Sequence, residues 1–341
     1  MSVAGLVSDR RVVSRVLSKT RGLVAGVGLT AILATHSGPG HRLAAAPAAT
    51  ALRLEALVSA APIDAPMSER VARISAAFLG APYVLDPAGE GADAPIDRDP
   101  EMPLDRMDCQ TLVETVLALA RARRPDEVWP ELRAIRYRHG MLSFELRHHF
   151  PEVDWFPANV ARGVVADVSS EVAAEHGTAT ASARITRQDW LRSLVRNPTQ
   201  ARNDHLRSSR AAQAELERLA AAATDVTGTI RYVAKGALAR ADVLARIPDG
   251  AVVLIVRPET SMFGRVGSVQ NVSHMGFAVR TPQGLVYRHA SSTRRRAVVD
   301  RPLAGYLEAM NRTKTFAGIA VYAVLARQPT ADSAERVGSQ R

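Results

Sequence analysis

One cysteine and two histidines are the residues of this sequence best suited to covalent chemistry. Cys109 is the only cysteine of the chain, so it can form no disulfide with a second cysteine of the chain and no multi-cysteine metal cluster. It follows Asp108, a residue type favoured at helix N-caps, and opens an apolar pattern that predicts a helix from about Cys109 to Arg123. The N–H groups and the positive dipole end of a helix N-terminus stabilise a thiolate, so Cys109 is a candidate nucleophile.

The histidines His274 and His289 lie on the two strands of a predicted hairpin whose turn is Thr281–Gly284. If the turn is centred in the middle of this segment, His274 lies opposite Ser291. His289 lies two residues before Ser291, so both imidazoles project from one face within side-chain reach, whereas a slip of one residue would separate them. Together with Cys109 they would supply a nucleophile, an acid–base group and a residue that orients it, as a thiol hydrolase requires.

The periodicity around these residues predicts an α+β fold. The run at 251–256 is continuously apolar and rich in β-branched residues, which predicts a strand that is buried on both faces. The other predicted elements are a helix that begins near Ser68 and ends before Gly80, a helical segment within 199–223, hairpin strands at 274–280 and 285–290, and a strand at 318–325.

The chain begins with the pattern of an export signal, predicted over residues 1–46: a basic stretch, an uncharged apolar run at 22–35 and an Ala44-Ala45-Ala46 cleavage pattern. We therefore expect an exported protein of the periplasm or cell envelope, with no stable membrane span after signal cleavage. Residues 47–66 are predicted as an Ala/Pro-rich linker, 67–326 as a single domain with an insertion at about 155–223, and 327–341 as a disordered tail.

The formal net charge of +10 does not predict a nucleic-acid partner. Residues 1–46 hold six basic residues against one acidic residue, so half of the net charge precedes the predicted domain. The sequence also predicts no metal site: His148 and His149 are adjacent, and neighbouring residues on a strand point to opposite faces.

Four blocks of the sequence resemble the N-acetylmuramoyl-L-alanine amidase-like family of bacterial cell-wall hydrolases, within the NlpC-type branch of the papain-like cysteine peptidase superfamily. The Asp-Cys block that opens a helix and the Ser-His-x-Gly block are the most specific. The blocks, spread over residues 68–325, are Phe78-Leu79-Gly80-Ala81-Pro82-Tyr83, Met107-Asp108-Cys109-Gln110-Thr111-Leu112-Val113-Glu114, Ile135-Arg136-Tyr137-Arg138-His139-Gly140, and Ser273-His274-Met275-Gly276 with His289-Ala290-Ser291.

This resemblance implies a papain-like cysteine hydrolase core in which the nucleophile helix packs on an antiparallel β-sheet, with a helical insertion. It implies that Cys109 is the nucleophile, that His274 is the general base and that His289 completes a Cys-His-His triad by fixing the imidazole. The substrate-binding residues that it implies are Tyr83, Arg136, Tyr137, Ser273 and Ser291.

The implied function is that of an exported enzyme that cleaves an amide bond of peptidoglycan or of a muropeptide, without a cofactor. The family name points to the bond between N-acetylmuramic acid and L-alanine. Two alternatives stay open, a γ-D-glutamyl-diamino acid endopeptidase that cuts the stem peptide and a catalytically inert cell-wall-binding protein of the same fold. The same thiol could also transfer an acyl group to an amine instead of to water.

Overall fold

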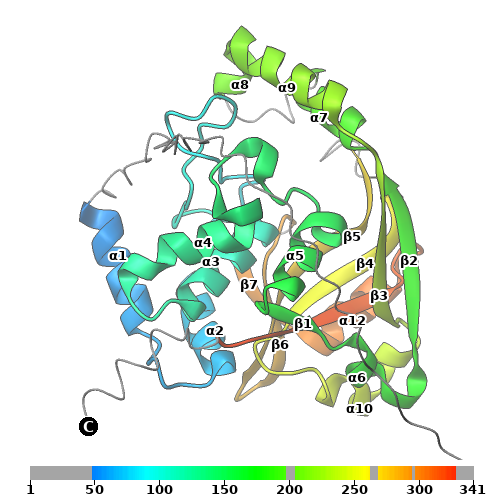
Figure 1. Ribbon diagram of the computed structural model, residues 1–341. Helices are drawn as coiled ribbons and strands as arrows, with labels where there is room; N and C mark the ends of the chain where they lie inside the picture. Colours follow the sequence, from blue (N-terminus) through cyan, green and yellow to red (C-terminus); the bar gives the residue numbers. More distant parts are fainter. Residues whose placement is uncertain (1–47, 197–203, 262–267, 294–295, 328–341) are drawn as a thin grey trace, which may run out of the picture. The chain divides into compact units, whose positions relative to one another are not determined.

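An eight-stranded antiparallel sheet forms the centre of the protein (Figure 1). The computed structural model describes residues 48–196, 204–261, 268–293 and 296–327. The strand order is β2-β3-β8-β4-β5-β6-β7, and β1 pairs with β8 outside this path. The strands are β1 Val165–Asp167, β2 Thr178–Ile185, β3 Val226–Ala234, β4 Val252–Ser261, β5 Val269–Thr281, β6 Gly284–Ala290, β7 Val298–Pro302 and β8 Gly318–Val324.

Helices flank this sheet and make the fold a mixed α+β fold, as the sequence predicts. The α-helices are α1 Ala48–Ser59, α2 Met67–Ala76, α3 Cys109–Arg121, α4 Val128–Arg136, α5 Phe156–Ala161, α6 Ser169–Ala173, α7 Arg187–Arg196, α8 Asp204–Ser208, α9 Arg210–Ala222, α10 Ala241–Ala245 and α12 Leu303–Asn311. Short 3-10 helices are η1 Pro125–Glu127, η2 Arg138–Gly140, η3 Phe144–Leu146, η5 Ala174–His176 and η6 Ala237–Ala239, and η4 Pro151–Trp155 is a π-helix. Within the described ranges, no helix is long and apolar enough to cross a membrane.

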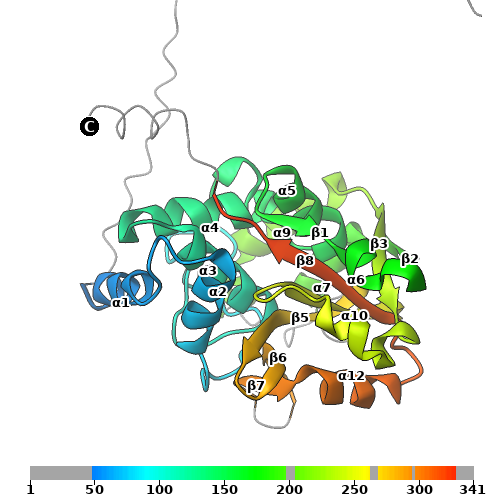
Figure 2. The ribbon, with the colours of Figure 1, turned by 90° about the horizontal axis from the view of Figure 1, so that it is seen from below.

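Strand β4 separates two hydrophobic cores, and the prediction that it is buried on both faces is confirmed. Val252, Leu254 and Val256 pack into the core that contains α2 and α3. Val253 and Ile255 point to the opposite side, where the core contains α10 and α12. Figure 2 shows α2 and α3 on one side of the sheet and α10 and α12 on the other. Because side chains alternate between the two faces of a strand, β4 contributes residues to both cores.

The structure corrects the linker that the sequence predicts over 47–66. Residues 48–59 form helix α1, and Leu54, Leu57 and Val58 pack into the main core. Arg70 of α2 donates hydrogen bonds to the carbonyls of Ala61 and Pro62, so the chain after α1 is held as well. Alanine is the strongest helix former, and leucines at helical spacing give this segment an apolar face. The folded part that the structure describes therefore begins with α1 at Ala48, ahead of the predicted start at 67.

The insertion predicted at 155–223 is only partly helical. Strands β1 and β2 belong to it and join the main sheet through β8 and β3. Along β2 the inward residues include Ala181 and Ala183, which are too small to give the sequence a strong alternation of hydrophobicity. The separate helical part is α7–α9, which forms a small core of its own at one end of the sheet (Figure 1).

Both predicted terminal segments fall largely outside the described residues. The export signal at 1–46 lies there entirely, and of the tail at 327–341 only Arg327 is described. Arg327 forms ion pairs with Glu127 at 3.1 Å and with Glu131 at 3.4 Å, so this residue belongs to the folded part of the chain.

Candidate active site

A cavity of about 470 Å³ lies where the first turn of α3 faces strands β5 and β6. The side chains of Cys109, His274 and His289 all line it. Cys109 comes from α3, whereas the histidines come from neighbouring strands more than 160 residues further along the sequence. The structure thus brings together the three residues whose chemistry the sequence singles out.

Asp108 sets the position of Cys109 by capping α3. Its Oδ1 accepts a hydrogen bond from the backbone N–H of Thr111 at 2.7 Å, as predicted for an N-cap. Its Oδ2 accepts a second bond, from the N–H of Asp86 at 2.9 Å, and so ties the helix start to a loop that also lines the cavity. The carboxylate is nearly buried, so the cap keeps Cys109 in the first turn, where the helix dipole stabilises a thiolate.

The two histidines contact each other directly. Strands β5 and β6 pair Phe277 with Arg288 and Ala278 with Tyr287, which is the register that the centred turn predicts. In this register His274 Nε2 lies 2.6 Å from His289 Nδ1, so one ring donates a hydrogen bond to the other. The prediction that both imidazoles share a face is confirmed.

Gly276 allows the strands to approach beside this pair. A Cβ at this position would lie 2.6 Å from the carbonyl oxygen of Arg288 and 2.7 Å from the Cβ of His289. Any side chain would therefore displace His289, which gives a physical reason for glycine in the Ser-His-Met-Gly block.

His289 packs against two tyrosine rings, which also contact each other, and is only 3% exposed. Its ring stacks on Tyr287 with centroids 4.7 Å apart, and Tyr306 of α12 approaches its edge at 5.2 Å. Burial lowers the pKa of His289 to about 4, and the Arg301 guanidinium acts in the same direction. His289 is therefore neutral at neutral pH. A neutral His289 that accepts at Nδ1 holds the Nε2 proton of His274, which leaves His274 Nδ1 to exchange a proton with a thiol.

Three of the predicted substrate-binding residues line the cavity: Tyr83, Ser273 and Ser291. Tyr83 forms a backbone bridge with Met107, two residues before Cys109. Ser273 Oγ donates to the carbonyl of Ile255 at 3.2 Å, and Ser291 Oγ donates to that of Thr293 at 3.1 Å.

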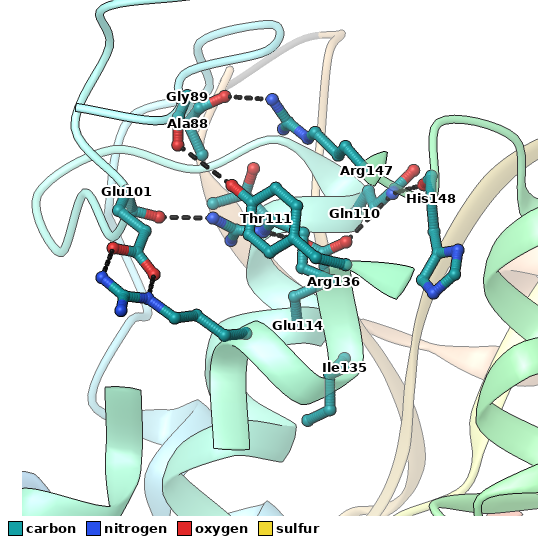
Figure 3. Close-up of polar contacts among 12 residues, drawn as sticks. Ala88, Gly89, Glu101, Gln110, Thr111, Glu114, Ile135, Arg136, Arg147 and His148 are labelled. Atoms are coloured by element: carbon teal, nitrogen blue, oxygen red, sulfur yellow. Dashed lines mark hydrogen bonds and ion pairs between the residues drawn. The ribbon is translucent and has the colours of Figure 1, made fainter. Parts of the chain in front are cut away.

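The other two predicted substrate-binding residues, Arg136 and Tyr137, do not belong to the lining that the structure describes. Arg136 is fully buried at the end of α4, where it donates to Glu114 Oε2 at 2.6 Å and to the carbonyl of Glu101. Figure 3 shows Arg136 with Glu101 and with Glu114 of α3. Tyr137 is equally buried and donates to Glu90 Oε1 at 3.1 Å. Both residues brace α3 and its neighbouring loop, because α4 turns them toward the interior.

Glu114 connects the buried Arg136 to the cavity. Its Oε1 accepts a hydrogen bond from Gln110 Nε2 at 3.0 Å, and Gln110 lines the cavity next to Cys109. Gln110 also donates to the carbonyl of His148 (Figure 3).

Several further groups of the cavity wall are not among the substrate-binding residues that the sequence predicts, although a cleft or surface role is expected of His149. An aromatic cluster of Phe144, His149, Phe150 and Trp190 forms one side. Burial lowers the pKa of His149 to about 3, so this ring is neutral, and its Nε2 lies 2.7 Å from the carbonyl oxygen of Phe144. Arg257, Arg301 and Tyr306 line the wall beside His289. These residues come from distant elements, and no local spacing connects them with Cys109.

One group of possible metal ligands occurs in the described ranges, and it does not line the cavity. Glu175, His176 and Asp242 bring their ligand atoms within 4.8 Å of one another. Arg240 and Arg246 already form ion pairs with Asp242, at 3.3 and 3.2 Å. The carboxylate is thus engaged by two cations.

Comparisons with known proteins agree with this architecture. The model of a family described as N-acetylmuramoyl-L-alanine amidase-like matches residues 73–316. A crystal structure of a Legionella pneumophila protein assigned to the DUF1460 family is 29% identical in sequence and superposes with a TM-score of 0.74. The alignment covers 83% of this chain and 96% of the Legionella chain. An N-acetylmuramoyl-L-alanine amidase from Bacteroides uniformis is 24% identical, covers 76% of this chain and 99% of its own, and has the same fold with a TM-score of 0.53. No curated protein matches the sequence significantly.

Proposed function

Because the chain belongs to the N-acetylmuramoyl-L-alanine amidase-like family, we propose that it is an exported cell-wall hydrolase with a cysteine nucleophile. Its substrate is an amide bond of peptidoglycan or of a muropeptide, and its first target is the bond between N-acetylmuramic acid and L-alanine. The observation that carries this proposal is the 2.6 Å contact between His274 and His289 in the cavity that Cys109 lines. A merely structural cysteine would not need a histidine pair facing it.

In this mechanism the Cys109 thiolate attacks the carbonyl carbon of the amide. His274 takes the thiol proton at Nδ1 and then gives it to the leaving amine, while His289 accepts a hydrogen bond from the Nε2–H of His274 and so fixes its ring. The backbone N–H groups at the start of α3 stabilise the oxyanion that develops on the carbonyl oxygen. A water molecule, deprotonated by His274, then hydrolyses the thioester and releases the thiol.

A papain-like arrangement is part of the proposal. It is supported by the position of Cys109 at the N-terminus of α3 and by the packing of α3 against β5, the strand that carries His274. The NlpC-type branch rests on the Asp-Cys and Ser-His-x-Gly blocks of the sequence.

The proposal is tested by incubating the protein from residue 47 onward, and its Cys109→Ala variant, with peptidoglycan and with purified muropeptides. We expect the wild type alone to release intact stem peptides from the sugar, as identified by mass spectrometry. Cleavage after γ-D-glutamate would retain the mechanism and assign the endopeptidase bond instead. If neither protein changes a substrate while both sediment with the wall, the protein is a wall-binding protein and not an enzyme.

A further inference from the structure

Two arginines lie against one face of α12 at the end of the cavity where His289 is found. The guanidinium carbon of Arg301 lies 5.3 Å from the ring centroid of Tyr306, and Arg257 Nη2 lies 3.8 Å from Met310 Sδ. Tyr306 and Met310 are four residues apart on the helix and therefore share a face. Both arginines also line the cavity, so two cations border the same end of it.

Arg301 has no carboxylate within ion-pair distance among the residues that the structure describes. Its neighbour Asp300 is already bound by Arg288, through two bonds of 2.7 Å each. Arg301 instead lies beside two uncharged groups, the neutral ring of His289 and the phenol of Tyr306. Arg301 is half-buried, so an anion bound to it would interact with it more strongly than at an open surface.

A third arginine of the cavity shows the contrasting case. Arg147 is bound by Asp86 at 3.4 Å and by Asp97 at 3.5 Å, and it donates to the carbonyl of Ala88 at 2.7 Å. Its charge is balanced by groups of the protein. The end of the cavity at Arg301 is therefore the end suited to an anionic part of a ligand.

We propose that Arg301, assisted by Arg257, binds the α-carboxylate of the D-isoglutamyl residue of the peptidoglycan stem. This inference rests on the proposed function, but not on which of the two amide bonds is cut. At most one residue, L-alanine, separates this carboxylate from the carbonyl that Cys109 attacks, whichever bond is cut. The two arginines line the cavity that also holds His274 and His289, the histidines that act on this carbonyl in the proposed mechanism. Guanidinium groups bind carboxylates through paired, charge-assisted hydrogen bonds.

The test compares two muropeptides that differ only in this group, one with D-isoglutamate and one with its uncharged amide, D-isoglutamine. We expect the wild type to cleave the acid with a kcat/KM roughly 10- to 100-fold higher, as for the loss of a charge-assisted hydrogen bond. In Arg301→Gln the two substrates should be cleaved at nearly equal rates, whereas Arg301→Lys should keep part of the preference. The control Arg312→Gln, on an exposed face of α12, should retain the full preference.

The ratio of the kcat/KM values for the two muropeptides separates an effect on carboxylate binding from an effect on acid–base chemistry. Arg301 also lowers the pKa of His289, so its replacement changes the rate for both substrates, but only a carboxylate contact changes their ratio. Equal wild-type rates for the two substrates would overturn the proposal. A muropeptide whose C-terminal carboxylate is replaced by a carboxamide serves as a second comparison. If its kcat/KM falls instead of that of the D-isoglutamine substrate, the enzyme recognises the C-terminal carboxylate and the proposal is overturned too.

A binding measurement keeps this inference separate from the proposed function. Calorimetry with Cys109→Ala and the two uncleaved muropeptides should give weaker binding of the amide, and the difference should disappear in Cys109→Ala/Arg301→Gln. If the wild type hydrolyses nothing but this binding difference is found, the enzyme proposal fails and the carboxylate site stands. If hydrolysis is found without any difference between the substrates, the carboxylate site fails alone.

Discussion

The buried ion pair between Glu114 of α3 and Arg136 of α4 provides the strongest test of how the protein supports the helix that carries Cys109. Both side chains are almost completely excluded from solvent, at 0% and 1% exposure, and the charged atoms lie 2.6 Å apart. Glu114→Gln keeps the shape of the side chain and removes its charge, which leaves the buried guanidinium uncompensated. Breaking a buried pair in this way costs about 3–5 kcal/mol of unfolding free energy. For a domain of this size that is a fall in Tm of roughly 6–20 °C.

The assay is urea denaturation followed by circular dichroism, with Tm measured in parallel. Glu308→Gln is the control, because it breaks an exposed i,i+4 pair on α12, and it should change the Tm by less than about 2 °C. The double variant Glu114→Gln/Arg136→Met removes both charges and should be more stable than Glu114→Gln alone. A loss below about 1 kcal/mol in Glu114→Gln would refute the reasoning. So would a folded Arg136→Met that has lost only substrate affinity, since that would make Arg136 a substrate contact.

Three further predictions concern the cap, the strand contact and pH. Asp108→Ala removes the hydrogen bonds to the backbone N–H groups of Thr111 and Asp86. It should lower the unfolding free energy in urea by about 1–2 kcal/mol and slow the alkylation of Cys109 by iodoacetamide. An unchanged alkylation rate would contradict the role of the cap. Gly276→Ala should abolish hydrolysis while the protein stays folded by circular dichroism, because its Cβ would overlap His289; wild-type activity would contradict this account. Desolvation lowers the pKa of the half-buried His149 from 6.5 to about 3, so its contribution to stability is present above pH 6.5 and is lost as the pH falls toward 3. His149→Phe should therefore show a shallower loss of unfolding free energy over that interval, and an unchanged slope would be the contrary result.

Local signals in the sequence were sufficient for the centre of the site. An N-cap aspartate before an apolar helical pattern identified the start of α3, and a proline–glycine turn identified the register that places His274 beside His289. These features depend on residues close together in sequence, whose geometry is determined by backbone preferences.

Features that depend on long-range packing could not be predicted in this way. Tyr306 contacts His289 from a helix that has no distinctive pattern in the sequence. Arg136 belongs to a block that suggested substrate contact, but the direction of its side chain is set by Glu114, 22 residues earlier. Alanine is ambiguous in two places: in α1 it gives the composition of a linker, and in β2 it is too small to show the alternation of buried and exposed side chains.

The claim that Cys109 is the nucleophile is tested most directly by trapping the acyl-enzyme. The protein is mixed with a muropeptide, quenched in acid during turnover and analysed by intact-mass and peptide mass spectrometry. We predict a thioester on Cys109 whose added mass is that of the sugar moiety without the stem peptide, which identifies both the nucleophile and the bond. Continued cleavage by Cys109→Ala at the wild-type rate, with no adduct on Cys109 of the wild type, would contradict the account.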